Sequence, residues 1–116
     1  MNPTAVECIV FEAAGLLPDA WRSFSAQGPV RCFNPGLLRD GGGWILAYRV
    51  VGPDGLRRIA LCRLDPAFRV VAGSALPLTD RVRFRRGAAY PEVATKWFAD
   101  PRLYRLGGRV FVYWNS

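Results

Sequence analysis

The chain has 116 residues, with 16 Lys and Arg against 9 Asp and Glu, 3 Cys and no His. This length allows one ordinary domain at most and is enough to bury a core. The absence of His excludes histidine metal sites and every nucleophile–histidine mechanism, and no cofactor motif is present. The apolar runs are too short to cross a bilayer, so no membrane partner is expected.

The net charge is +7, and 15 of the 16 basic residues are Arg. They are spread along the chain rather than gathered in one block. A basic chain can bind nucleic acid or a membrane surface, but dispersed arginines also make an ordinary solvated face. The charge therefore leaves the class of partner open, with the solvated face favoured.

The three cysteines, Cys8, Cys32 and Cys62, are isolated from one another and each adjoins apolar residues. This placement predicts buried free thiols. An odd number of cysteines without a basic, apolar leader fits a reducing compartment, so a cytoplasmic location is expected.

Residues 1–30 are expected to hold a first strand and an irregular segment. The strand is predicted over Val6–Phe11, and a short helical turn is predicted to start at Pro18-Asp19 and run through Trp21 and Phe24.

Residues 31–79 read as a four-stranded antiparallel meander, because Gly, Pro and Asp punctuate short apolar runs. The run after Gly43 is nearly continuous in apolar residues and is therefore expected to be covered on both faces. The predicted strands are Leu37–Arg39, Trp44–Val51, Arg57–Leu64 and Phe68–Leu76.

The pattern then restarts. A shift of 66 positions carries residues 34–49 onto 100–115 without a gap, with five identities that include Pro35 on Pro101 and Gly41-Gly42 on Gly107-Gly108. Strand-opening prolines and hairpin glycines recur together, which predicts an internal structural repeat.

A four-stranded meander repeated at a long period is typical of a β-propeller. The predicted fold is therefore all-β: a partial five-bladed propeller of about one and a half blades. The first blade is placed at 31–79, a linker at 80–97 and an incomplete second blade at 98–116. A closed ring would need about 330 residues, so a fragment is expected, with open blade edges available for self-association.

The first strand of each propeller blade lines the central channel, so equivalent positions of successive blades converge there. Asn34 and Asp100 are such positions. Together they could hold sugar hydroxyls, and Asp100 could act as an acid, base or nucleophile. The alternative is that Asn-Pro and Asp-Pro merely open strands, since both residues suit turns.

The residues Phe33-Asn34-Pro35-Gly36-Leu37, Leu46-Ala47-Tyr48-Arg49-Val50 and Ala99-Asp100-Pro101-Arg102-Leu103-Tyr104 resemble the five-bladed β-propeller glycosidases. This clan includes invertases, arabinanases and β-mannoside phosphorylases, and the phosphorylase branch is the most similar. The resemblance covers roughly residues 31–116. It implies a carbohydrate partner, a mannoside in that branch, with inorganic phosphate if the protein is a phosphorylase.

By the same resemblance, Asn34 and Arg49 would contact the sugar, Asp100 would bind hydroxyls or tune the catalytic acid, and Arg102 would brace the site. Two residues depart from the family pattern. Asn34 replaces the nucleophilic Asp of invertase-like members, which weighs against ordinary retaining hydrolysis, and Ala99 stands where the phosphorylases usually have Glu. The chain alone is expected to be inactive.

Trp97 precedes the Asp100 motif and, with Phe98, is the best aromatic candidate for a wall of the sugar site, while most other aromatic residues are expected in the core. Two alternatives remain. The alternating arginines of Arg81–Arg86 could bind nucleic acid or could simply keep an exposed edge strand soluble. The protein could also be a non-catalytic propeller remnant.

Overall fold

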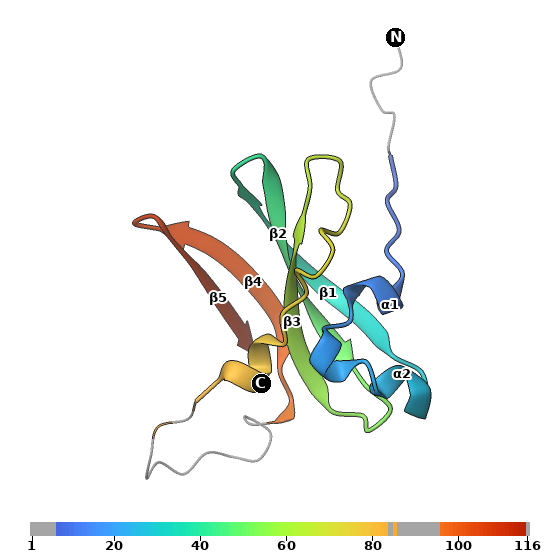
Figure 1. Cartoon of the computed structure of the whole chain (residues 1–116). Coiled ribbons are helices and arrows are strands. Elements are labelled where there is room, and N and C mark those ends of the chain that lie inside the picture. Colours follow the sequence, from blue (N-terminus) through green and yellow to red (C-terminus); the bar gives the residue numbers. More distant parts are fainter. Residues whose placement is uncertain (1–6, 84, 86–95, 116) are drawn as a thin grey trace.

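The computed structural model describes residues 7–83, 85 and 96–115 (Figure 1). Within them the strands form two antiparallel sheets, one of order β1-β2-β3 and one of order β4-β5. The strands are β1 (Arg31–Asp40), β2 (Gly43–Val51), β3 (Arg57–Leu64), β4 (Ala99–Leu106) and β5 (Arg109–Asn115). The helices are short: α1 (Ala13–Leu16), α2 (Phe24–Gln27) and the 3-10 helices η1 (Asp19–Trp21) and η2 (Leu78–Arg81).

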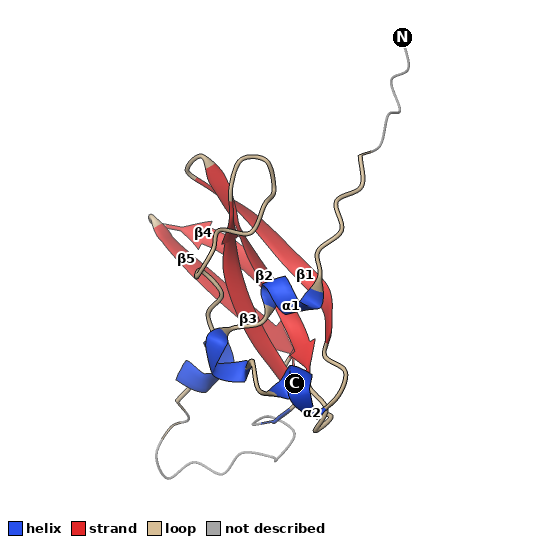
Figure 2. Cartoon of the chain, turned by 45° about the vertical axis from the view of Figure 1, so that its right-hand side comes forward, coloured by secondary structure: helices blue, strands red, loops and turns tan. Residues whose placement is uncertain are grey.

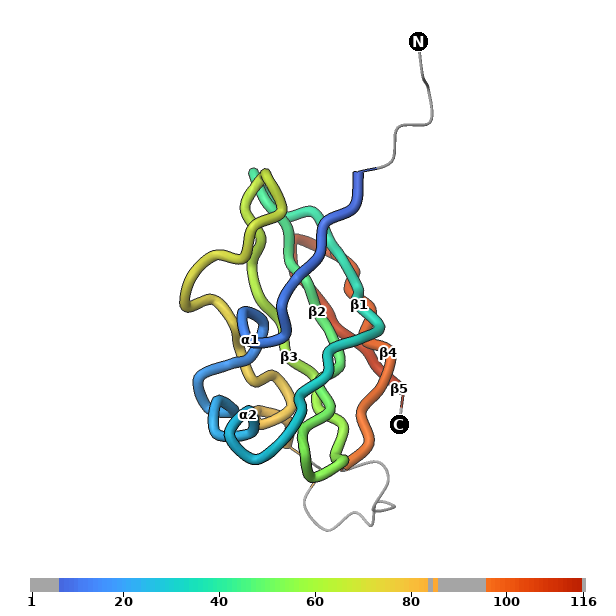
Figure 3. Tube along the Cα trace, turned by 90° about the vertical axis from the view of Figure 1, so that its right-hand side faces the viewer, coloured from blue at the N-terminus to red at the C-terminus, as the bar shows by residue number. Residues whose placement is uncertain are grey.

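The β1-β2-β3 sheet forms the middle layer of the molecule. The helical segment before β1 covers one of its faces, and the β4-β5 hairpin packs on the other face (Figures 2 and 3). Between the two sheets, Ile45 and Leu61 line a cavity together with Leu103 and Val112. A mostly β fold with two antiparallel sheets is thus present, as the sequence predicted.

Strand β2 is buried on both faces, which confirms the prediction from its continuous apolar run. Leu46, Tyr48 and Val50 belong to the core cluster under the helical segment. Ile45 and Ala47 alternate with them and are buried on the side of β4-β5. Successive side chains of a strand point to opposite faces. A strand in this central position therefore needs apolar residues at both the odd and the even positions.

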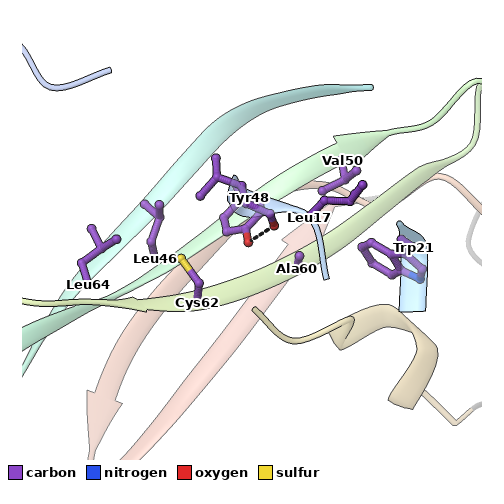
Figure 4. Close-up of a cluster of buried hydrophobic side chains, with 9 residues drawn as sticks. Leu17, Trp21, Leu46, Tyr48, Val50, Ala60, Cys62 and Leu64 are labelled. Carbon is purple, nitrogen blue, oxygen red and sulfur yellow. Dashed lines mark hydrogen bonds between the residues drawn. The ribbon is translucent and has the colours of Figure 1, made fainter. Parts of the chain in front are cut away.

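Polar atoms in this core are paired, and the pairs fix the helical segment on the sheet. The Tyr48 hydroxyl donates a hydrogen bond to the main-chain carbonyl of Leu16 (Figure 4). The indole Nε1 of Trp21 donates to Asp80 Oδ2 at 2.9 Å. The predicted helical turn near Pro18 is confirmed, since η1 and α2 lie there. A buried donor without a partner is costly, so these bonds select one seating of the segment.

The predicted fourth strand at Phe68–Leu76 is wrong. This segment meets β3 through isolated bridges from Val70 to Leu64 and from Leu76 to Leu61, and through scattered hydrogen bonds to Arg63, not through a continuous ladder. Phe68 and Gly73 have φ values of +62° and +75°, and two left-handed residues break an extended backbone. The first sheet therefore has three strands, and an irregular segment lies along β3 where a fourth strand was predicted.

The prediction for residues before β1 also needs correction. Residues 7–11 of the predicted strand Val6–Phe11 lie outside regular structure, and Val6 is outside the described residues. Strand β1 starts at Arg31 rather than Leu37, because its backbone continues through a bulge at the Asn-Pro step. Cys62 is buried as expected, but Cys8 is exposed and Cys32 is only partly covered.

The outward face of the β4-β5 hairpin is aromatic and exposed, contrary to the expectation that most aromatic residues are core. Tyr104 and Tyr113 are 43% and 54% exposed, and Phe111 stacks on Tyr104 with ring centroids 5.3 Å apart. Trp97 is exposed as well, whereas Tyr48 and Phe98 are buried. In the described part of the chain, no helix is long and apolar enough to span a membrane.

Candidate functional site

The β1-β2 and β4-β5 hairpins follow one plan, offset by 66 residues. Phe33 pairs with Arg49 and Ala99 with Asn115, and in each case the register then shifts across a bulge. After the bulge, Asp40 closes on Gly43 and Leu106 on Arg109 around a two-residue glycine turn. The repeat predicted from the sequence therefore extends to the strand register.

The bulges hold Asn34 and Asp100 in the same unusual conformation. Their φ values are +52° and +53°, in the left-handed region that Asn and Asp tolerate better than most residues. Proline follows each of them, and a proline disfavours α conformations of the preceding residue. Two matching strained residues at equivalent positions point to a site whose geometry the surrounding strands impose.

Asn34 and Asp100 meet between the two hairpins. The Asn34 amide Nδ2 donates a hydrogen bond of 2.6 Å to Asp100 Oδ1. Asn34 is exposed and Asp100 is partly exposed, so solvent reaches the pair. Within the described residues, the side-chain oxygen Oδ1 of Asn34 and the second carboxylate oxygen, Oδ2, of Asp100 make no hydrogen bond. Both oxygens can therefore accept hydrogen bonds from the hydroxyl groups of a ligand.

Arg49 lies one strand away from Asn34 and on the face of the sheet that β4-β5 covers. Its guanidinium carbon lies 4.8 Å from the ring centroid of Phe33, its cross-strand partner. Its Nε is buried and has no hydrogen-bond partner among the described residues. Arg49 thus brings an unused donor close to the strand that carries Asn34.

Arg102 and Trp97, the other two predicted site residues, point elsewhere. Arg102 pairs across the strand with Tyr113 on the outward face of the hairpin, and its Nη1 donates to the carbonyl of Pro101 at 3.0 Å. Trp97 lies against β3, where Arg57 stacks over its ring at 4.6 Å. Strand β3 is at the opposite edge of the sheet from β1, so the structure does not join Trp97 to the Asn34–Asp100 pair.

Two further interactions at this interface were not predicted. Phe33 supports the Arg49 side chain, which follows from the register once β1 is known to begin at Arg31. Asp40 accepts hydrogen bonds from Arg63 of β3 and Arg105 of β4, at 2.8 and 2.6 Å. The adjacent guanidinium groups hold the pKa of Asp40 below its usual range. Only the repeat alignment, which places Arg105 on the residue before Asp40, hinted at this contact.

The basic stretch Arg81–Arg86 is described only in part. Arg81 ends η2, and residues 82 and 83 belong to no strand. The Arg83 guanidinium donates to the carbonyls of Asp80 and Val82. Phe84 and Arg86 lie outside the described residues. The described arginines therefore do not form the predicted edge strand.

No protein-family model matches the chain, and no curated protein or solved structure matches it either.

Proposed function

We propose that this chain is the opening part of a β-propeller protein that binds a carbohydrate where the innermost strands of successive blades meet. The hydrogen bond between Asn34 and Asp100 carries the proposal, because it joins equivalent positions of two repeated hairpins. In a propeller such positions surround the channel, so ligand-binding groups from several blades gather there.

The interface between the repeats supports this arrangement. Leu38, Ile45 and Ala47 of the first hairpin lie on the face toward the second hairpin, and their equivalents by the 66-residue offset are Tyr104, Phe111 and Tyr113. The first set is largely covered and the second is exposed. A further blade packed on the aromatic set would repeat the contact already present once.

The chemistry of the pair suits a sugar. An amide and a carboxylate held 2.6 Å apart present acceptors that can bind adjacent hydroxyl groups. One carboxylate does not make a hydrolase, because glycoside hydrolysis normally uses two. We therefore assign binding to Asn34 and Asp100, place glycoside hydrolysis or phosphorolysis in a complete propeller, and expect the 116-residue chain alone to turn over no glycoside.

Titration of the purified chain with a panel of monosaccharides, followed by two-dimensional NMR, tests the proposal. The informative variant is Asn34→Gly combined with Asp100→Gly, because glycine keeps the left-handed backbone while removing both side chains. We expect weak saturable binding of at least one sugar, mannose included, which the double variant abolishes. Asp19→Gly, which removes an exposed carboxylate elsewhere, is the control.

Absence of binding by every sugar, or equal binding by the chain and its double glycine variant, would refute the carbohydrate assignment. Binding of single-stranded oligonucleotides that weakens with salt would instead favour the basic nucleic-acid module. If neither a sugar nor an oligonucleotide binds, the non-catalytic propeller remnant is the interpretation that stands.

A further inference from the structure

We infer a second binding site, for an oxyanion such as phosphate or a carboxylate, at the end of the β1-β2-β3 sheet where β1 begins. Its residues are Arg31, Arg49 and Arg57. Arg31 and Arg57 lie in one cross-strand row with Val51 between them, and Arg49 lies in the next row on the same face. Strand spacing places their Cα atoms within about 10 Å of one another.

Among the residues that the structure describes, these three arginines have no ion-pair partner. No hydrogen bond or ion pair joins any of their guanidinium groups to the described residues. Two other arginines of the sheet are paired: Arg58 with Asp54 at 2.7 Å and Arg63 with Asp40 at 2.8 Å. Arg39 of β1 stacks on Trp44 at 5.3 Å and lies at the far end of the strand from Arg31. Three uncompensated positive charges on one small area attract an anion, and burial of Arg49 Nε strengthens that attraction by removing competing water.

Two of the three guanidinium groups are held in place by aromatic rings. Arg49 stacks on Phe33 at 4.8 Å and Arg57 on Trp97 at 4.6 Å. Stacking occupies the flat face of a guanidinium but leaves its N–H groups at the edge, where they bind two oxygens of one anion. An arginine fixed in this way loses little side-chain entropy when the ligand binds.

Strand β4 begins over this end of the sheet. The Phe98 amide donates to the main-chain carbonyl of Arg57 at 3.4 Å, and the chain then crosses toward β1, where Asp100 meets Asn34. Asp100 is a nearby negative charge, but its Oδ1 is engaged by Asn34. Asp54, in the turn between Val51 and Arg57, is also close, but it pairs with Arg58 at 2.7 Å. Within the described part of the chain, the three guanidinium groups therefore keep the area basic.

The oxyanion site does not depend on the carbohydrate site. Arg49 lies close to the strand of Asn34, but Arg31 and Arg57 belong to the oxyanion site alone, and inorganic phosphate alone is a sufficient ligand. The two can therefore fail separately.

Titration of the full 116-residue chain with inorganic phosphate in dilute chloride buffer, measured by calorimetry and by phosphorus NMR, tests the inference. We expect saturable binding that Arg49→Gln weakens at least about tenfold, since a charge-assisted bidentate contact is lost. Arg49→Lys should bind less well than the native chain but better than Arg49→Gln, because lysine keeps the charge without the planar fork.

Arg31→Gln changes an exposed residue and keeps the test decisive if Arg49→Gln does not fold. Arg22→Gln is the matched control, because Arg22 is 69% exposed and already pairs with Asp19. The Asn34→Gly, Asp100→Gly variant should bind phosphate at least as tightly as the native chain, because it removes a nearby carboxylate and none of the three arginines. Acetate competing with phosphate would show that the site also takes carboxylates.

Binding that is not saturable, or that Arg31→Gln, Arg49→Gln and Arg22→Gln reduce equally, would overturn the inference. Either result would assign the attraction to the net charge of the whole chain.

Discussion

Gly36 of β1 lies directly against the backbone of Pro101 in β4. A Cβ atom at position 36 would come within 2.6 Å of the Pro101 carbonyl oxygen and 3.3 Å of the Arg102 Cα. Both are main-chain atoms, so no side-chain rotation could relieve the contact. This close approach lets the two hairpins meet tightly enough for Asn34 to reach Asp100.

Replacing Gly36 with Ala should therefore push the hairpins apart. We expect a loss of about 1–3 kcal/mol in the free energy of unfolding, the usual cost of overpacking. Gly42→Ala is the control, because a Cβ there would meet nothing within 4 Å and Gly42 does not have a positive φ. Urea unfolding of both variants measures the difference. Equal stability of the two would show that β1 and β4 are not in contact in solution.

The Asp40 carboxylate should make stability depend on pH. Arg63 and Arg105 hold the pKa of Asp40 below its unfolded value, so the folded state binds the proton less readily. The stabilisation is therefore present above the unfolded pKa and is lost as pH falls through the folded pKa. Asp40→Asn should lower the melting temperature near neutral pH and lower it less in acid, because the native carboxylate is then protonated too.

Differential scanning calorimetry of the native chain and Asp40→Asn, from neutral pH down to acid, measures how the difference in melting temperature changes with pH. Asp19→Asn removes an exposed carboxylate that pairs only with Arg22, and serves as the comparison. A gap between native chain and Asp40→Asn that widens in acid would contradict the assignment.

The three cysteines should react at well-separated rates. Cys8 is exposed, Cys32 is partly covered and Cys62 is buried. Burial raises the pKa of Cys32 to about 11 and also raises that of Cys62. Because the thiolate is the nucleophile, iodoacetamide should modify Cys8 first, and Cys32 should speed up as pH rises toward its pKa. Peptide mass spectrometry over time gives the order; modification of Cys62 before Cys8 would contradict the core described here.

The alternation of apolar residues allowed much of the first sheet to be predicted. Residues 57–64 form β3 as expected, with Ala60 and Cys62 on the core face and Ile59 on the other. The glycine turn after Asp40 was also predictable, since a two-residue hairpin needs a positive φ, found at Gly41.

Other features depended on tertiary contacts that no local pattern encodes. The segment from Phe68 to Leu76 is apolar enough for a strand, but left-handed residues at its start, Phe68, and within it, Gly73, break it. At the candidate site, the repeat predicted that Asn34 and Asp100 would converge, and they do. Trp97 was linked to Asp100 by closeness in sequence, but the chain crosses the sheet between them.

Ile45 and Phe111 occupy the same position of the repeat but different environments, and this difference can be measured. Ile45 is 8% exposed under the β4-β5 hairpin, whereas Phe111 is 39% exposed on its outer face. Ile45→Ala should cost about 2–5 kcal/mol, because it removes a buried side chain and enlarges the cavity between the two sheets. Phe111→Ala should cost much less, because one side of its ring already faces water and little packing is lost.

Chemical unfolding at two protein concentrations measures both values. A large cost for Phe111→Ala that grows with concentration would show that a second copy covers the aromatic face. A large cost independent of concentration would show that this face is covered within the chain itself, contrary to the fold described here.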